Sequence, residues 1–276
     1  MDRLEKVIQK MSQPPVVKDP IEKIIEKNAV KAAINVKKSS INGISYTQTK
    51  MHKIDPLLMR QRRVISLEKF GPESETFRLL RTKVLKQLRD NNWNSIGITA
   101  PSQGAGKSMV AVNLAIAMAM EVNQTVLLVD LDLRRPQLQH YFDFRVDKGL
   151  QDCLLHDTPI ADVLVNPSIE RLVILPGVGM MEGTSELLTG HKMREIVQEL
   201  KQRYESRIII FDLPPVLTGD DVLVSMEFFD SALLVVAEGE SKPSDISKAI
   251  QLLSATNLLG TVLNKAEKMP EHIGQY

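Results

Sequence analysis

The chain has 276 residues, of which 43% are hydrophobic and 25% charged, and its formal net charge is +1. This composition fits a globular protein with one large domain and an appendage. No apolar run approaches the roughly 20 residues of a membrane-spanning helix, and the N-terminus lacks the apolar stretch of a signal peptide, so a cytoplasmic protein is expected. The single cysteine, Cys153, excludes an internal disulfide and is expected to be a small buried apolar residue.

The first 63 residues are expected to form a basic extension ahead of the main domain. They hold 14 Lys and Arg against 6 Asp and Glu, whereas the remaining residues hold 21 against 28. Such an extension suits an anionic partner, which includes nucleic acid, lipid or an acidic protein surface, but lysines on a solvated helix produce the same pattern. The charge alone leaves these interpretations open.

Two amphipathic helices and a linker are predicted within this extension. Residues 1–11 have apolar side chains at helical spacing, and a second helix begins where Asp19 caps the chain and Pro20 takes the first helical position. Its apolar stripe runs to Val36 and is covered either by the chain's own domain or by a partner or membrane surface. The Ser, Asn, Gly and Thr content of residues 37 to about 61 predicts a linker.

A third helical pattern, from about residue 72 to residue 89, carries charges at three-residue intervals. Glu75, Arg78 and Arg81 therefore project from one side of the predicted helix. These side chains are either solvated or form carboxylate–guanidinium contacts between subunits, for which the planar guanidinium group is well suited.

Residues 100–108 predict a phosphate-binding loop between an apolar strand and a long helix. Glycines at 104 and 106 let the backbone curl, so that its N–H groups point toward the phosphates of a nucleotide near the positive end of the following helix. Lys107 adds a mobile positive charge and Ser108 a hydroxyl ligand for Mg²⁺. Pro101 stands where the usual pattern has its first glycine, and a glycine-rich strand-to-helix turn is the alternative interpretation.

Carboxylates follow two further apolar strands. Residues 126–129 run into Asp130 and Asp132, and residues 208–211 run into Asp212. Open α/β sheets bind ligands at the carboxyl ends of their strands. An unpaired carboxylate there is costly to desolvate, whereas a metal-bound nucleotide supplies a partner for its charge. The loop and the two carboxylate segments together predict a nucleotide site.

Strands and helices are expected to alternate after the loop. Strands are predicted near residues 125–130, 171–176, 207–212, 231–236 and 259–263, and helices near 192–203 and 243–255. This order favours an α/β fold with a mainly parallel central sheet and helices on both faces. At the end of the last strand, Asn264 has an amide that either pairs with the edge of adenine or caps the strand.

These motifs, in this order and spacing, resemble those of the bacterial tyrosine kinases of capsule and exopolysaccharide synthesis. The resemblance covers roughly residues 65 to 267. It is carried by the loop ending at Ser108 and by three further motifs, Glu75-x-x-Arg78-x-x-Arg81, Asp130-x-Asp132-x-Arg134 and Phe-Asp212-Leu-Pro-Pro215. That family belongs to the MinD/ParA-like branch of P-loop ATPases. A kinase domain over residues 64–267 and a flexible tail over 268–276 are therefore expected.

The resemblance implies an active site that uses ATP and Mg²⁺. Lys107 and the loop amides would hold the phosphates, and Ser108 would ligate the metal. Asp132 and Asp212 would hold the metal's waters, while Asp130 would either accept the proton of a tyrosine hydroxyl or contact the metal directly. The nucleotide-binding set implied is Ser102, Gln103, Gly104, Ala105, Gly106, Lys107, Ser108, Met109 and Asn264.

Two departures from the family pattern affect what the resemblance implies. Relatives usually have a hydroxyl residue where Met109 stands, which would loosen contact to the α-phosphate. They also end in a tyrosine-rich tail, whereas this chain offers only Tyr276 there, which is the expected phosphoacceptor, with Tyr46 as the next candidate. The helix motif at residues 75–81 would mediate formation of a ring of identical subunits.

The expected partners also follow from the resemblance. They are a membrane chain-length regulator that activates the kinase through its cytoplasmic segment, further copies of the chain, and a phosphotyrosine phosphatase. No nucleic acid partner is expected. The protein would lie in the cytoplasm, held at the inner membrane by the regulator.

Two other functions remain open. The first is a positioning ATPase of the MinD/ParA type, although Ser102 stands where many such ATPases carry a lysine. The second is a nucleotide-binding scaffold of the export machinery that has lost its kinase output.

Overall fold

The computed structural model describes residues 50–67, 71–202 and 206–267. The two helices predicted within residues 1–36, the candidate tyrosine at 46 and the tail over 268–276 lie outside these ranges. Among the described residues, no helix combines the length and the apolar character needed to cross a lipid bilayer.

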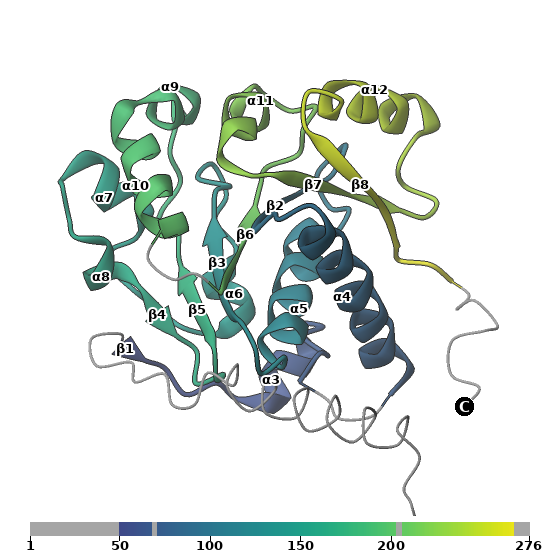
Figure 1. Ribbon diagram of the computed structural model, residues 1–276, viewed down its shortest axis with the longest axis horizontal. Helices are drawn as coiled ribbons and strands as arrows, with labels where there is room; N and C mark the ends of the chain where they lie inside the picture. Colours follow the sequence, from purple (N-terminus) through teal and green to yellow (C-terminus); the bar gives the residue numbers. More distant parts are fainter. Residues whose placement is uncertain (1–49, 68–70, 203–205, 268–276) are drawn as a thin grey trace, which may run out of the picture. The chain divides into compact units, whose positions relative to one another are not determined.

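The described residues form one sheet of eight strands (Figure 1). Every neighbouring pair is parallel except β4 and β5, which are antiparallel. The sequence prediction of a mainly parallel sheet is therefore confirmed. In spatial order the strands are β1 (Lys50–Met51), β4 (Val165–Asn166), β5 (Leu172–Leu175), β3 (Thr125–Asp130), β6 (Arg207–Asp212), β2 (Ser95–Thr99), β7 (Ser231–Ala237) and β8 (Asn257–Asn264).

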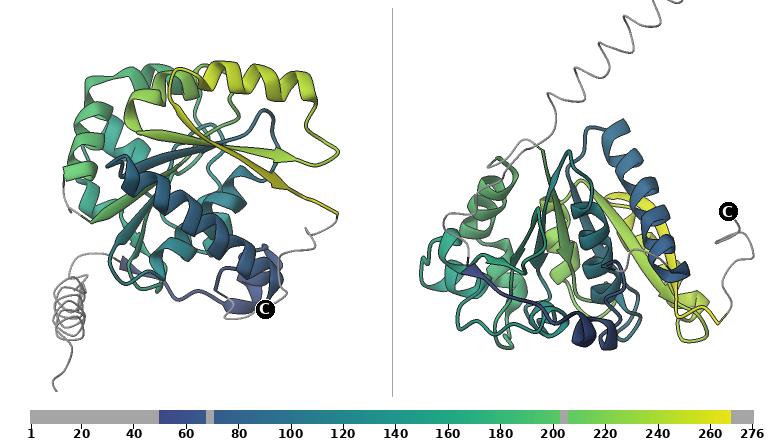
Figure 2. Two further views of the ribbon diagram at one scale, coloured as in Figure 1. Left: turned by 45° about the vertical axis from the view of Figure 1, so that its right-hand side comes forward. Right: turned by 90° about the horizontal axis from the view of Figure 1, so that it is seen from below.

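Helices cover both faces of this sheet, as predicted (Figures 1 and 2). The core on one face includes side chains of α3 (Pro56–Gln61), α4 (Pro72–Asp90), α5 (Lys107–Ala119) and α6 (Leu138–Phe142). The core on the other face includes side chains of α7 (Leu150–Leu155), α8 (Ile160–Val163), α9 (Thr184–Thr189), α10 (His191–Gln202), α11 (Asp221–Ser225), the short 3₁₀ helix η1 (Met226–Phe228) and α12 (Pro243–Leu253).

Alternation along the strands explains why there are two cores. In β3, Val126 and Leu128 pack into the core beneath α5, whereas Leu127 and Val129 pack into the core on the opposite face. Successive side chains of a strand point to opposite faces, so a strand covered on both sides must be apolar throughout. That requirement accounts for the continuous apolar runs that made the strands recognisable in the sequence.

Helix α5 is the element that positions the phosphate loop. Twelve of its 13 residues are buried, because it lies between the sheet and α4, with which it packs side by side (Figure 1). Several alanines in this helix allow its backbone to approach the sheet closely. The N-terminus of α5 is thereby held at the carboxyl end of β2, directly after the loop.

The structure differs from the linker predicted as far as residue 61. Lys50 and Met51 pair with β4 as a parallel edge strand, and Met59 in α3 is only 1% exposed. The buried amide of Asn113 in α5 accepts hydrogen bonds from the backbone N–H groups of Ile65 and Ser66. The linker prediction was therefore wrong for residues 50–61, because single apolar anchors such as Met59 produce no periodic pattern.

Candidate nucleotide-binding and catalytic site

The predicted site residues lie at the carboxyl edge of three adjacent strands. Strands β3, β6 and β2 are neighbours in the sheet, and Asp130 at the end of β3 is directly opposite Asp212 at the end of β6. The loop that follows β2 leads into α5. This is the edge at which an open parallel sheet binds its ligands.

The loop between β2 and α5 has the backbone of a phosphate cradle. Gly104 and Gly106 have φ angles of 82° and 92°, which favour glycine, and Gly106 is the N-cap of α5. The helix begins at Lys107, so its unpaired N–H groups and the positive end of its dipole are directed at the loop. This geometry suits an anionic phosphate group.

Asn264 contacts this loop from the end of β8. Its Nδ2 donates a hydrogen bond to the carbonyl oxygen of Ala105 at 2.7 Å. A Cβ atom added at Gly106 would lie 2.1 Å from the same Nδ2, so the close approach requires glycine at 106. The amide for which the sequence left adenine pairing and strand capping open is therefore bonded to the phosphate loop through its nitrogen.

This contact predicts a base-independent effect on nucleotide binding. Replacement of Asn264 by alanine is expected to weaken binding of ATP and of inorganic tripolyphosphate alike, by about fivefold, the effect of one hydrogen bond worth about 1 kcal/mol. Isothermal titration calorimetry measures both affinities. Asn257→Ala, which removes the amide at the opposite end of β8, is the matched control and should leave both unchanged. A loss of ATP affinity alone would instead assign Asn264 to the base.

Lys107 lies at the centre of the carboxylate group. Its Nζ is 2.8 Å from Asp132 Oδ2 and 3.5 Å from Asp212 Oδ1, and it donates to Ser108 Oγ at 3.2 Å. The Lys107 residue as a whole is only 9% exposed. Four residues that the sequence singled out are thus in mutual contact around one buried ammonium group.

Asp130 is held differently from the other two aspartates. Its Oδ2 accepts hydrogen bonds from the backbone N–H groups of Gln137 and Leu138, at 3.0 and 3.1 Å. Its Oδ1 is buried and has no hydrogen-bond partner among the described residues, and the same holds for both carboxylate oxygens of Asp212. Of these oxygens, Asp212 Oδ1 still lies within ion-pair distance of Lys107. A buried carboxylate oxygen without a partner is costly, so the site is suited to a cationic or hydrogen-bonding ligand.

The protonation equilibria of the site reflect this excess of negative charge. Burial raises the pKa of Asp130 to about 8, and the charge of Asp212 adds to the effect. Burial also raises the pKa of Asp212, although the nearby Lys107 opposes the rise. For Lys107 itself burial lowers the pKa, but the carboxylates of Asp212 and Asp132 outweigh burial and raise it overall. One lysine does not balance three buried carboxyl groups.

These residues fit a magnesium-bound nucleotide. Within the described ranges, no group of three or more His, Cys, Asp or Glu side chains is arranged to hold a metal by itself. Mg²⁺ does not need such a cage, because it usually keeps several waters and takes phosphate oxygens together with one or two protein ligands. The unpartnered oxygens of Asp130 and Asp212 and the hydroxyl of Ser108 are suitable donors.

Two adjacent arginines near the site were not distinguished by the sequence. Arg134 forms an ion pair with the buried Asp221 at 2.7 Å, and its Nε also donates to Thr184 Oγ1 at 3.1 Å. Arg135 instead extends toward the phosphate loop, where its Nη1 donates to Gln103 Oε1 at 3.1 Å. The pattern Asp130-x-Asp132-x-Arg134 signals an arginine at this point, but only the packing assigns the two side chains to different partners.

The residues predicted to join subunits make contacts within the chain. Arg78 pairs with Glu75 one turn earlier in α4, at 3.1 Å. Arg81 reaches the end of α5, where it pairs with Glu121 at 3.2 Å and donates to the carbonyl oxygen of Ala117. Assembly of subunits through Glu75, Arg78 and Arg81 would break at least some of these contacts within the chain. Their role between subunits stays a prediction.

The remaining predicted residues are accounted for as follows. Cys153 is buried, as expected, and burial raises the pKa of its thiol to about 11. Tyr141 is half-buried and packs against the core, and the phosphoacceptor expected at residue 276 lies outside the described ranges. Met109 packs beside the loop, with its sulfur 3.3 Å from Asn113 Nδ2.

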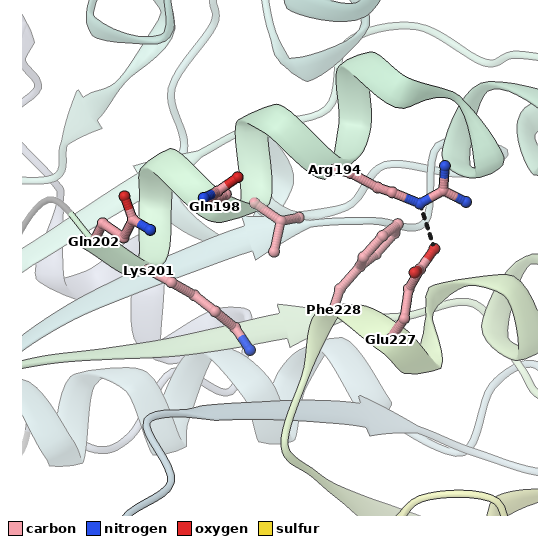
Figure 3. A pocket seen from close by; sticks show the side chains of 7 residues that line it. Arg194, Gln198, Lys201, Gln202, Glu227 and Phe228 are labelled. Atoms are coloured by element: carbon pink, nitrogen blue, oxygen red, sulfur yellow. Dashed lines mark hydrogen bonds and ion pairs between the residues drawn. The ribbon is translucent and has the colours of Figure 1, made fainter.

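A separate cavity of about 310 Å³ lies between α10 and η1 (Figure 3). Arg194 and Lys201 line it, but Arg194 pairs with Glu227 and Lys201 pairs with Asp230. Both cations are therefore neutralised within the chain, and this cavity presents no unpaired charge from these two residues to a ligand.

The fold and the site together define a P-loop ATPase with a mainly parallel sheet. The model of a family described as AAA domain matches residues 94–265. The chain is 30% identical to the tyrosine-protein kinase YwqD of Bacillus subtilis (strain 168) over 215 residues, which are 77% of this chain and 89% of YwqD. The chain belongs to this family of bacterial tyrosine-protein kinases.

Solved structures agree with this placement. The crystal structure of the chimerical protein CapA2B2 superimposes with a TM-score of 0.70 and 29% identity, over 79% of this chain and 94% of that one. The septum site-determining protein MinD of Pyrococcus horikoshii OT3, solved in complex with Mg-ADP, superimposes with a TM-score of 0.54 and 28% identity, over 64% and 74% of the two chains. The MinD-like branch expected from the sequence is thus confirmed at the level of the fold.

Proposed function

We propose that this chain transfers the γ-phosphoryl group of Mg-ATP to a protein tyrosine. The observation that carries the proposal is the buried group at the carboxyl edge of the sheet, where Lys107 contacts Asp132, Asp212 and Ser108 directly after the phosphate loop. Phosphoryl transfer depends mainly on positioning and on neutralising charge, and this arrangement supplies both.

Each side chain has a defined task in this proposal. Lys107 and the loop N–H groups bind the β- and γ-phosphates, while Ser108, Asp132 and Asp212 hold Mg²⁺ or its waters. Bound Mg²⁺ neutralises charge that develops on the transferred group. On phosphate binding, Lys107 exchanges part of its contact with the carboxylates for contact with the nucleotide.

Asp130 is the proposed acceptor of the tyrosine proton. One of its oxygens is fixed by two backbone N–H groups at the start of α6, which orients the carboxyl group, and the other oxygen has no hydrogen-bond partner among the described residues. A base must be within hydrogen-bond reach of the proton it removes, so the unpartnered oxygen is the reactive one. Direct contact of Asp130 with the metal is the alternative assignment.

The proposal extends to acceptor, partners and location. Tyr276 is the acceptor in the chain itself, reached by a neighbouring subunit in an assembly that uses Glu75, Arg78 and Arg81. A chain-length regulator of polysaccharide export activates the kinase and holds it at the inner membrane, and a phosphotyrosine phosphatase reverses the modification. The kinase domain would begin before residue 64, because β1 belongs to its sheet and Met59 to its core, and would end near residue 267.

Incubation of the full chain with labelled ATP and Mg²⁺ tests this function. We expect phosphotyrosine at residue 276 by mass spectrometry, no label in Lys107→Met, and loss of that site in Tyr276→Phe. Absence of phosphotyrosine in the wild type, with the regulator's cytoplasmic segment present, would remove the kinase assignment. If Tyr276→Phe incorporates as much labelled phosphate as the wild type, the acceptor tyrosine lies elsewhere in the chain.

A further inference from the structure

A cavity of about 440 Å³ lies beside the carboxylate group. The loop after β3 contributes Arg135, Pro136 and Gln137 to its lining, α6 contributes Gln139, and the loop after β5 contributes Gly179 and Met180. The backbone N–H of Gln137, within this lining, is the group that holds Asp130 Oδ2. The cavity therefore shares a wall with the proposed proton acceptor.

The two loops that form this cavity are tied to each other. Gln139 Nε2 donates to the carbonyl oxygen of Gly177 at 2.9 Å, and the backbone N–H of Met181 donates to the carbonyl oxygen of Leu133 at 3.1 Å. The side chain of Gln139 also accepts from the N–H of Val146, which fixes its orientation. Loops joined in this way offer a preformed surface to a ligand, which lowers the entropic cost of binding.

Arg135 is the only charged residue in this lining. Its neighbour Arg134 is committed to Asp221 and Thr184, whereas Arg135 is exposed and forms no ion pair within the part of the chain that the structure describes. Its hydrogen bond to the neutral side chain of Gln103 holds the guanidinium at the boundary between the phosphate loop and the cavity. A guanidinium in this state is available to a carboxylate of a ligand.

Met180 supplies an apolar surface at the same cavity. Its side chain is 82% exposed, the largest exposure among the exposed large hydrophobic residues in the described ranges. Thioethers make favourable contacts with aromatic rings, and the flexible methionine side chain adapts to different ring positions. The cavity thus offers one surface suited to an aromatic ring and one cation suited to an acidic group.

We infer that this cavity binds acceptor peptides of other proteins, and that Arg135 selects tyrosines flanked by acidic residues. Tyr276 follows Gly274 and Gln275, so it does not benefit from this selection. The inference rests on the proposed kinase function, because an acceptor hydroxyl must approach the phosphate site beside Asp130. The tyrosine ring packs on Met180 while a neighbouring Glu or Asp of the peptide pairs with Arg135. Arg134 acts differently, as a positioning residue that ties the loop after β3 to the first residues of α9 and α11, Thr184 and Asp221.

Two synthetic peptides test the selection. Both contain a central tyrosine, flanked by glutamates in one and by glutamines in the other, and their KM and kcat are measured with the full chain at saturating Mg-ATP. The wild type is expected to have a KM for the acidic peptide about fivefold below that for the neutral one, the size of one partly exposed ion pair. This ratio should decline in high salt.

Substitutions of Arg135 identify the source of the preference. Arg135→Gln is expected to remove the difference between the two KM values, and Arg135→Glu to reverse it, so that the glutamate-flanked peptide has the higher KM. The matched control is Arg145→Gln, since Arg145 is exposed and outside the lining of the cavity. Anisotropy of a labelled acidic peptide with phenylalanine in place of tyrosine reports the same binding without catalysis.

These measurements distinguish failure of the proposed kinase function from failure of the proposed peptide selection by Arg135. A wild type that phosphorylates neither Tyr276 nor a tyrosine peptide overturns the proposed function and, with it, this inference. A wild type that labels Tyr276 but neither peptide overturns the inference alone. A working kinase whose KM ratio is unchanged by Arg135→Gln overturns the inference alone. A loss confined to kcat, equal for both peptides, also overturns it, because that result places Arg135 on the transferred phosphoryl group.

Discussion

Replacement of Asp212 by asparagine is expected to abolish activity and to stabilise the nucleotide-free fold. Kinase activity should decline by about a hundredfold, because a carboxylate that orients a metal's ligands is lost. The free energy of unfolding should rise by about 1 kcal/mol, because one of three buried carboxyl groups that share the single ammonium of Lys107 is replaced by a neutral amide. Labelled-phosphate transfer and thermal unfolding measure the two effects.

The stabilisation should depend on pH in a defined direction. Burial raises the pKa of Asp212 in the folded chain, so the unfolded chain loses this proton at lower pH than the folded one does. The carboxylate therefore costs stability above its unfolded pKa of about 4, and the gain in Asp212→Asn should vanish below that pH. Exposed Asp147→Asn is the control and should change neither quantity. A lower melting temperature for Asp212→Asn at neutral pH would contradict the assignment.

Replacement of Lys107 by methionine is expected to remove both activity and stability. The nucleotide loses the cation that faces its phosphates, and transfer should decline by at least about a hundredfold. Asp132 and Asp212 lose their buried partner, which should lower the free energy of unfolding by about 3 kcal/mol at neutral pH. Denaturant unfolding without nucleotide measures the second effect separately from the first.

A surface lysine provides the comparison for this variant. Lys192 also forms an ion pair, with Asp157, but at the surface, where the two side chains are 42% and 82% exposed. Lys192→Met should leave activity unchanged and should alter stability far less than Lys107→Met, because exposed ion pairs contribute little. Equal destabilisation by the two substitutions would show that the buried ion pairs of Lys107 contribute no more to the free energy of unfolding than an exposed ion pair does.

The opposite stability effects of these two variants follow from one imbalance. Three carboxyl groups, from Asp130, Asp132 and Asp212, surround a single ammonium group in the nucleotide-free chain. Removing a carboxylate relieves the imbalance, while removing the lysine increases it. Stability is thus partly given up to keep a site that a metal-bound nucleotide completes, a common feature of active sites.

Much of the fold followed from local patterns in the chain. The apolar runs became β3, β5, β6 and β7 with boundaries close to those predicted, because strands buried on both faces must be apolar throughout. The predicted edge strand β8 also formed, although none of its residues is buried. The phosphate loop was recognisable because its glycines and its lysine are adjacent in sequence. The segment over residues 50–61 was missed, since its few apolar anchors are too widely spaced to form a periodic pattern.

The hydrogen-bond partners of Asn113 could not be predicted from the local sequence. Asn113 is the one polar residue of α5 after Ser108, and a lone polar residue in an apolar stretch signals a buried hydrogen-bonding role. Its partners are the backbone groups of residues 63, 65 and 66, which lie 47 to 50 positions earlier in the chain. No spacing rule connects positions so far apart.

The amino-acid sequence by itself determined which chemical groups stand at the carboxyl ends of the strands, because a strand end and the residues after it are local features. Tertiary structure decided which of those groups meet. The strand order brings β3 beside β6 and so places Lys107 against Asp132 and Asp212, while the packing of α6 turns Asp130 toward two backbone N–H groups. The partners of Arg134, Arg135 and Asn264 were likewise set by loop packing between distant segments, which local periodicity does not encode.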